Sequence, residues 1–293
     1  KAVTVLEESN AAQPGVIAVK DGSQANMKAN YTITIGAAPT VDISKLAVTA
    51  TFTATDREYD GTTAVAVALQ QPGNMGSGDT LSAATAFTGT VASKAADTNQ
   101  KDVTVAGGTY AVKDANDADM LGNYTITLNA TKPKVTISKK AITVTLKGDK
   151  TYDGTTAFTG AAIDDAGSLF TNQLAVKDAT ATPPTRDTVT LASSSVTFDS
   201  KNVGATASSQ SGTLGGADKD NYAATFQAGT LAIVQKAVTV EFNATNRAYD
   251  GTTTVALTLK QPAGKVTGDT FSTSTAFTGT AADKNQGNGK AVT

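Results

Sequence analysis

The sequence has no cysteine, no histidine and no tryptophan among its 293 residues. Without cysteine there are no disulfides, zinc–thiolate sites or thiol nucleophiles, and without histidine the commonest general base and metal ligand is missing. No apolar run is long enough to span a membrane, so we expect no membrane insertion. The net charge is −2 and basic residues form no stripe, which argues against nucleic acid as a partner.

Charged residues are also scarce, at 17% of the chain, whereas 40% of residues are hydrophobic. Threonine, serine, asparagine, glutamine and glycine supply the remaining polarity. Segments such as 142–146 alternate apolar residues with threonine, which is the period of a strand, and turn residues interrupt them about every 8–12 residues. The sequence predicts an all-β fold of immunoglobulin-like antiparallel β-sandwich repeats in an elongated rod.

Internal repetition is the strongest pattern in the sequence. A basic residue, one variable residue and Tyr-Asp-Gly-Thr-Thr occur at 57–63, 150–156 and 247–253. Asn-Tyr followed by alternation occurs at 30–35, 123–128 and 221–226, and a closing strand occurs at 41–45, 135–139 and 231–236. Between these anchors lies Gly-Asp-Thr at 78–80 and 268–270, which the middle copy replaces with Arg-Asp-Thr at 186–188.

These anchors divide the chain into four segments. We name them the N-terminal half (1–45), the first repeat (46–139), the second repeat (140–236, with a longer loop at about 160–184 that has room for a short helical turn) and the C-terminal half (237–293). The chain begins and stops at similar phases of the repeat, as expected for an excised fragment. We expect the two halves to complete each other head to tail between copies of the chain.

The junctions between repeats are predicted to be short. Val135 and Ile137 have odd numbers, whereas the next inward positions, Ile142 and Val144, have even numbers. The same change of parity leads from Ile43 to Leu46 and Val48, and from Ile233 to Val238 and Val240. Because a parity change sends side chains to the opposite face, each closing strand leaves one core and the chain enters the next within two or three residues, too few for a flexible tether.

Twelve residues of the repeated motifs are predicted to have structural roles. They are Tyr59, Asp60, Gly61, Tyr152, Asp153, Gly154, Tyr249, Asp250 and Gly251 of the Tyr-Asp-Gly motif, and Tyr31, Tyr124 and Tyr222 of the Asn-Tyr motif. In the Tyr-Asp-Gly motif we expect a turn in which Asp accepts a local backbone hydrogen bond, Gly supplies a positive φ and Tyr buries its ring.

Acidic residues before the Asn-Tyr motif are candidates for a calcium site, the one cofactor that the composition leaves open. They are Asp114, Asp117 and Asp119 in the first repeat and Asp218 and Asp220 in the second. The corresponding segment 23–26 has no acidic residue, so a metal that held every repeat together would lack ligands there. A solvated loop is the competing interpretation, and no other metal or cofactor site is predicted.

Three further interpretations compete with a purely structural one. Thr-x-Thr pairs such as Thr32 and Thr34 occur on ice-binding faces, but here they lie on short, separate strands. Lysine and asparagine near strand ends could form an isopeptide bond, which requires an apolar site and a carboxylate. Paired carboxylates could hydrolyse polysaccharides, but the aspartates lie in turns that recur with the repeat, so we predict no enzyme and no catalytic residue.

The repeated motifs resemble the YDG and MBG families of bacterial immunoglobulin-like repeats. The resemblance covers nearly the whole chain and includes Lys-Asn-x-Gly at 201–204 and 284–287, Gly-x-Asp-x-x-Asn-Tyr at 216–222 and the closing Lys-Ala junctions. It implies large secreted or surface-attached proteins, often of filamentous-haemagglutinin type, that act in adhesion and biofilm formation.

The resemblance therefore predicts an extracellular stalk of a bacterial adhesin, whose partners are neighbouring repeats of the same chain. A module that binds glycans, matrix polysaccharide or a like copy is the alternative, and a polysaccharide-active enzyme is the second alternative.

Overall fold

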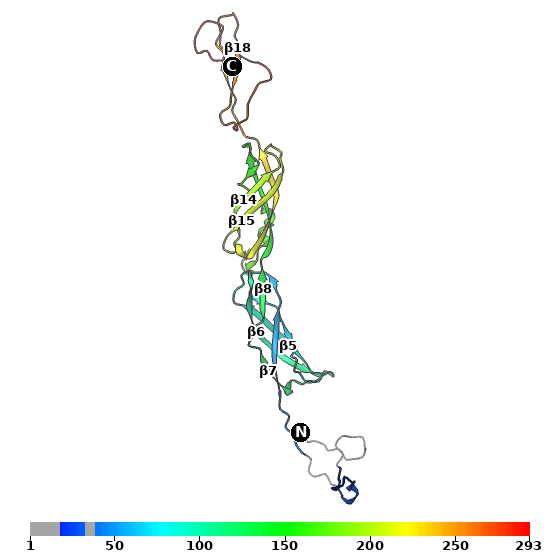
Figure 1. Cartoon of the computed structure of the whole chain (residues 1–293). Helices are drawn as coiled ribbons and strands as arrows, with labels where there is room; N and C mark the ends of the chain where they lie inside the picture. Colours follow the sequence, from blue (N-terminus) through cyan, green and yellow to red (C-terminus); the bar gives the residue numbers. More distant parts are fainter. Residues whose placement is uncertain (1–17, 33–38) are drawn as a thin grey trace. The chain divides into compact units, whose positions relative to one another are not determined.

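The computed structural model describes residues 18–32 and 39–293. Strands account for 48% and short 3-10 helices for 6% of the structure, which confirms the all-β prediction. Within the described residues no helix is long and apolar enough to cross a membrane. Figure 1 colours the chain along the sequence and labels several of its strands.

The first repeat consists of two sheets. Its elements, after η1 (Lys28–Asn30) of the N-terminal half, are β1 (Leu46–Ala54), β2 (Arg57–Glu58), β3 (Ala64–Val65), β4 (Val67–Gln70), β5 (Thr80–Val91), β6 (Asp97–Lys113), η2 (Leu121–Asn123), β7 (Tyr124–Leu128) and β8 (Lys134–Ser138). One sheet has the order β4-β1-β7 and the other the order β2-β8-β6-β5-β3.

The second repeat has three small sheets, with the orders β11-β9-β16, β10-β14-β15 and β12-β13. Its elements are β9 (Lys140–Thr151), β10 (Ala157–Phe158), β11 (Ala162–Ile163), η3 (Ala166–Ser168), η4 (Thr171–Gln173), β12 (Val176–Asp178), β13 (Thr185–Arg186), β14 (Thr190–Phe198), β15 (Ala207–Gly215), η5 (Lys219–Asn221) and β16 (Tyr222–Val234). The predicted helical turn in the long loop is confirmed by η3 and η4. The C-terminal half forms a single sheet of β17 (Glu241–Ala244), β18 (Thr254–Lys260) and β19 (Phe277–Thr280).

Strand pairing is mixed, so the predicted antiparallel pairing is found for most pairs of strands but not for all of them. β1 pairs in parallel with β7, β9 with β16, and β2 with β8. In each repeat the parallel partners come from its beginning and its end, and the intervening strands form the connection that parallel pairing requires. The Asn-Tyr strand therefore lies beside the first strand of its own repeat.

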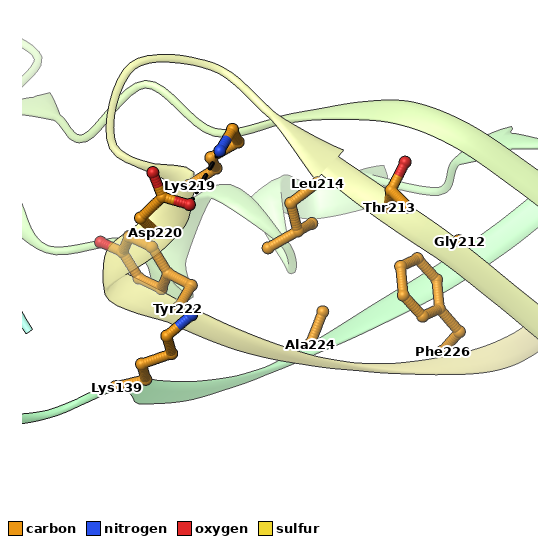
Figure 2. A pocket seen from close by; sticks show the side chains of 9 residues that line it. All are labelled: Lys139, Gly212, Thr213, Leu214, Lys219, Asp220, Tyr222, Ala224 and Phe226. Atoms are coloured by element: carbon orange, nitrogen blue, oxygen red, sulfur yellow. Dashed lines mark hydrogen bonds and ion pairs between the residues drawn. The ribbon is translucent and has the colours of Figure 1, made fainter. Parts of the chain in front are cut away.

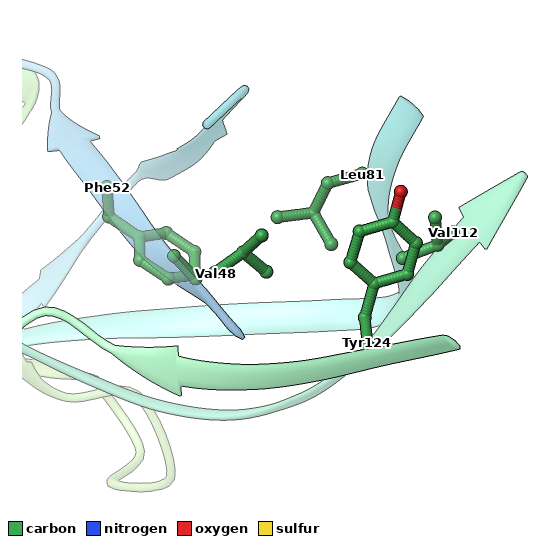
Figure 3. Packing of buried hydrophobic residues seen from close by; sticks show 6 residues of the cluster. Val48, Phe52, Leu81, Val112 and Tyr124 are labelled. Atoms are coloured by element: carbon green, nitrogen blue, oxygen red, sulfur yellow. The ribbon is translucent and has the colours of Figure 1, made fainter. Parts of the chain in front are cut away.

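Figure 3 shows how side chains from four strands form the core of the first repeat. Val48 and Phe52 of β1 meet Leu81 of β5, Val112 of β6 and Tyr124 of β7, and each side chain is at most 8% exposed. The phenyl rings of Phe52 and Phe87 pack edge-on, with their centroids 4.9 Å apart. The alternation along β1 and β7 thus places apolar side chains on one face, as the period of a strand requires.

The predicted inward positions of the complete strands are confirmed, since Val135, Ile137, Ile142, Val144 and Leu146 are all buried. Other predicted inward positions are wrong. Exposed instead are Ile43, Leu46, Leu128 and Val240. Leu128 is the last residue of its strand and Leu46 is the first of its own. Ile43 and Val240 lie in the half-repeats.

The chain divides into two compact units that do not coincide with the repeats. One unit contains residues up to Ala54 together with 66–89 and 104–133, and the other contains 55–65, 90–103 and 134–293. The strands β5 and β6 contribute residues to both. The Tyr-Asp-Gly turn of the first repeat therefore belongs to the same unit as the whole second repeat.

Candidate functional site

The Tyr-Asp-Gly motif of the first repeat forms a tight turn with its own hydrogen bonds. The Oδ1 atom of Asp60 accepts the backbone N–H of Thr62 at 2.8 Å and its hydroxyl at 2.9 Å. The guanidinium of Arg57 lies 2.6 Å from the same oxygen. Burial opposes ionisation of Asp60, but these bonds outweigh it and hold the pKa of Asp60 below its ordinary value. Gly61 has a φ of +85°, which favours glycine.

The same turn forms in the other two copies of the motif. Asp153 accepts the N–H of Thr155 at 2.8 Å, and Asp250 accepts the N–H of Thr252 at 2.9 Å. The hydrogen bond from Lys150, followed by those from Thr155, lowers the pKa of Asp153 to about 2. The turn is therefore a local property of these seven residues.

The tyrosine of the first turn reaches a carboxyl group in the second repeat. The hydroxyl of Tyr59 donates to Oδ2 of Asp187 at 2.7 Å, and the hydroxyl of Tyr222 donates to the same oxygen at 2.7 Å. The two rings are edge-on, with centroids 5.7 Å apart. All three side chains are at most 4% exposed. One carboxyl group thus joins tyrosines from two repeats in a buried site.

The surroundings of Asp187 keep both tyrosines neutral. The backbone N–H of Ala175 donates to the hydroxyl of Tyr222 at 2.8 Å, and the N–H of Asp187 donates to the carbonyl of Ala175 at 2.9 Å. Burial first, and then the carboxyl group of Asp187, raise the pKa of Tyr59 and that of Tyr222 well above the ordinary value. The tyrosines therefore act as hydrogen-bond donors across the whole physiological pH range.

Parts of this arrangement recur at two other places. The hydroxyl of Tyr152 donates to Oδ2 of Asp269 at 3.0 Å, which joins the second repeat to the C-terminal half. The hydroxyl of Tyr124 donates to Oδ2 of Asp79 at 2.5 Å and accepts the N–H of Gly76 at 2.9 Å. In both tyrosines the hydrogen bond to the carboxyl group is the main cause of a raised pKa.

The space around the glycine of each turn shows whether another segment packs against that turn. A Cβ atom on Gly61 would lie 3.0 Å from Cβ of Ala175, and one on Gly154 would lie 2.7 Å from Cγ1 of Val266. A Cβ atom on Gly251 would meet nothing within 4 Å. The first two turns are therefore packed tightly against the following segment, and the third turn presents an open surface.

The aspartates that accept the tyrosine bonds lie in the Gly-Asp-Thr and Arg-Asp-Thr segments, for which the sequence alone predicts no role. They are Asp79, Asp187 and Asp269. The sequence does contain a signal for these aspartates, because the middle copy has Arg in place of the preceding Gly but keeps Asp-Thr. The sequence predicts structural roles for the tyrosines of both motifs, and the structure brings Tyr59 and Tyr222 together, whereas Tyr31 is 63% exposed.

The calcium candidates mostly bond to their own loops. Asp114 accepts the N–H groups of Asn116 and Ala118 at 2.8 and 2.9 Å, and Asp119 accepts that of Leu121 at 2.9 Å. The remaining three acidic residues form ion pairs. They are Asp117 with Lys113, Asp218 with Lys177 and Asp220 with Lys219. In the described part of the chain no group of three or more acidic residues is placed to hold a metal ion.

A shallow hollow lies beside the buried tyrosine of the second repeat (Figure 2). Its volume is about 290 Å³, and Ala224 and Phe226 of β16 face Leu214 of β15 across it. The ion pair of Lys219 and Asp220 lies at one end. This volume is at the lower limit of small-molecule sites, so the hollow offers little enclosure for a ligand.

The three motif copies coincide with the matches to a known family. The model of the YDG domain matches residues 43–133, 137–230 and 234–293. No curated protein and no solved structure gives a significant match. Since the three matches together cover most of the sequence, the chain belongs to the YDG domain family.

Proposed function

We propose that the chain is a structural spacer in which each Tyr-Asp-Gly turn fastens one repeat to the next. The repeats are immunoglobulin-like sandwiches joined into a stiff rod, and the rod is a stalk of a bacterial adhesin outside the cell. Its function in adhesion or biofilm formation is to hold a binding domain away from the surface, and it performs no catalysis.

The observation that carries this proposal is the hydrogen bond from Tyr59 to Asp187, which spans 128 positions of the sequence. It leaves the turn of the first repeat and ends in the second repeat, on the same oxygen that Tyr222 uses. A hydrogen bond in a buried site resists separation, because each group would be left without a partner while water is excluded. A binding site or an active site has no need of such a link at every repeat.

Two hydrogen bonds from backbone N–H groups to side chains support the same proposal. Glu58 accepts the N–H of Ala141 at 2.7 Å, and Asn221 accepts the N–H of Ala96 at 2.9 Å. Each of these bonds joins a residue of the first repeat to one of the second. Several bonds around a junction of two or three residues restrict bending far more than the peptide chain alone would.

The proposal predicts that breaking the link loosens the junction. Because the chain has no cysteine, Thr98→Cys and Val203→Cys introduce two spin labels at exposed positions, one in each repeat. We expect a narrow distribution of label distances by pulsed electron resonance, and a clearly broader one when Asp187→Ala is added. The buried tyrosines then lose their shared acceptor.

Asp79→Ala is the matched control, because Asp79 occupies the same motif but accepts no bond at this junction. It should leave the distance distribution unchanged. Equal widths with and without Asp187→Ala would mean that the link does not stiffen the junction. Saturable binding on a glycan array would favour a binding module over a spacer.

A further inference from the structure

We propose that the long loop of the second repeat (160–184) recognises the turn that precedes it, and that Arg186 is the residue that positions the loop for this contact. We call the surface that receives the turn the socket. It is formed by Ala175, Val176, Asp187 and Tyr222. The inference rests on the spacer proposal and deepens it, because it names the partner that the socket selects, a Tyr-Asp-Gly turn with no side chain at its glycine.

The tip of the turn lies directly against the loop. A Cβ atom added to Gly61 would lie 3.0 Å from Cβ of Ala175 and 3.4 Å from the carbonyl oxygen of Val176. Ala175 is only 5% exposed, and packed interiors have little free volume into which it could move. While the ring of Tyr59 packs against Tyr222, the tip of the same turn therefore meets a wall. A turn with a larger residue at the position of Gly61 would be excluded.

The loop also holds the groups that receive Tyr59. The N–H of Ala175 donates to the hydroxyl of Tyr222, and the carbonyl of Ala175 accepts the N–H of Asp187. The hydroxyls of Tyr59 and Tyr222 both donate to Oδ2 of Asp187. A shift of the loop would therefore displace the acceptor of Tyr59 together with the wall that the turn meets.

Arg186 fixes the part of the loop that comes directly before Ala175. Its Nη1 atom donates to the carbonyl of Leu174 at 2.7 Å and to that of Asn172 at 3.4 Å. Its backbone pairs with Val176 in the sheet of β12 and β13. Hydrogen bonds from an ionised guanidinium are stronger than those from a neutral donor. These bonds end on the loop, so Arg186 acts on the turn through the loop and is a positioning residue.

The preceding part of the loop is anchored on its own repeat. The side-chain amide of Gln173 exchanges two hydrogen bonds with the backbone of Thr143, at 2.7 and 2.9 Å. The side chains of Phe170 and Leu174 are each 5% exposed. Because these residues are packed and hydrogen-bonded, the loop can form a firm wall of the socket.

The arginine occurs where the loop is longer. In the first repeat Gly78, with a φ of +85°, stands before the corresponding aspartate. The shorter loop there brings the N–H of Gly76 to the hydroxyl of Tyr124 without an arginine. In the second repeat Ala175 makes the equivalent bond at the end of a longer loop. The change from Gly to Arg before the aspartate is thus explained by the need to hold this loop in place.

Removing the guanidinium tests the role of Arg186. Arg186→Met keeps the apolar part of the side chain but removes its donors to the loop. With spin labels at Thr98→Cys and Val203→Cys, we expect the population of widely spread label distances to rise about tenfold, because a hydrogen bond from a charged group is lost. Arg186→Lys keeps the charge but not the planar fork of donors, and it should give an intermediate distribution.

Lys147→Met is the matched control. Lys147 also binds the long loop, since its ammonium group lies 3.1 Å from Asp164, but this contact is at the end of β11 rather than at the socket. The variant should leave the label distances unchanged. If Arg186 merely stabilised the second repeat, Arg186→Met would lower the melting temperature without widening the distances while the repeat is folded. Circular dichroism verifies the folded state of both variants.

A second pair of variants tests the selection of glycine. Gly61→Ala should widen the label distances, because the new Cβ atom meets Ala175 and because the positive φ strains an alanine. Only the contact can be relieved from the other side. Adding Ala175→Gly should therefore narrow the distribution again. Ala161→Gly, which alters another buried alanine of the loop, should bring no such relief.

The inference is overturned if Arg186→Met leaves the distances as narrow as in the native chain while Asp187→Ala widens them. It is overturned as well if Lys147→Met widens them equally, or if Ala175→Gly brings no relief to Gly61→Ala. Unchanged distances in Asp187→Ala would contradict the spacer proposal itself, and this inference with it. The failure of the inference alone can therefore be distinguished from the failure of the proposed function.

Discussion

The first repeat and the C-terminal half contain nearly the same local sequence but differ in burial. Phe52 and Phe87 have ring centroids 4.9 Å apart, and Phe242 and Phe277 have theirs 5.0 Å apart. Yet Phe52 is 8% exposed, whereas Phe242 is 38% exposed. The tyrosine of the turn shows the same contrast, since Tyr59 is buried and Tyr249 lies in solvent.

The comparison shows which features depend on the local sequence alone and which depend on neighbouring strands. Turns and aromatic pairs form in both regions because their bonds lie within a few residues or between adjacent strands. Burial in the first repeat comes from β7 and β8, which lie beside β1 and β6. The described part of the C-terminal half has three strands and no equivalent of these two. A core therefore requires both ends of a repeat.

Replacing one of the paired phenylalanines should have the largest effect on stability. Phe52→Ala should lower the free energy of unfolding of the first repeat by about 3–5 kcal/mol, because it leaves a cavity among buried side chains. Phe242→Ala should cost only about 1 kcal/mol in its own region, since much of that ring already meets water. Hydrogen exchange read by mass spectrometry measures both regions in one molecule.

The two phenylalanine variants also control for each other, because each leaves the other region unchanged. Similar losses of protection in the two regions would contradict the claim that neighbouring strands cause the greater burial of Phe52. Loss of protection in the first repeat after Phe242→Ala would show that the regions are energetically coupled.

A smaller effect is expected at the tyrosine hydroxyls. Tyr59→Phe removes one donor from a buried carboxyl group and should reduce stability around 46–139 and 140–236 by about 1–3 kcal/mol. Tyr249→Phe removes a hydroxyl that is exposed in the isolated molecule and should change stability by less than about 0.5 kcal/mol. Thermal unfolding of the two variants compares these losses, and equal shifts in the two would contradict the difference expected between a buried and an exposed hydroxyl.

Much of the fold is readable from the sequence because its signals are local. The alternation of Ile142, Val144 and Leu146 predicts a buried strand, and Asp60 followed by Gly61 predicts the turn. The link from Tyr59 to Asp187 is not readable in this way. No spacing rule places two groups together across such a separation.

The wrong predictions of burial and of strand pairing arise because the sequence pattern is local. Alternation shows which residues share a face of a strand but not which neighbour covers that face. Leu46 and Ile43 were therefore expected inside, and both are exposed. The parallel pairing of β1 with β7 depends on the number of strands that connect them, which short turn signals do not reveal.

Replacing the aspartates of the turns should have the smallest effect, which should be seen in how stability depends on pH in acid. The pKa of Asp153 is about 2 in the folded chain, below the value of about 3.9 in an unfolded one. A lowered pKa contributes stability that is present above about pH 4 and is lost as the pH falls through about 2. Asp153→Asn should therefore flatten the acid dependence of protection in 140–236 within this window.

Asp250 provides the comparison, because its pKa is also lowered, first by the N–H of Thr252. Its partner Arg247 has a side chain that is 28% exposed, whereas Lys150 beside Asp153 is 5% exposed. Water screens the more exposed pair more strongly, so Asp250→Asn should have the weaker effect on acid dependence. Hydrogen exchange with long labelling times, measured between about pH 2 and 4, decides this. If Asp250→Asn flattened the acid dependence more than Asp153→Asn, burial of the cation would not be the cause of the difference between the two turns.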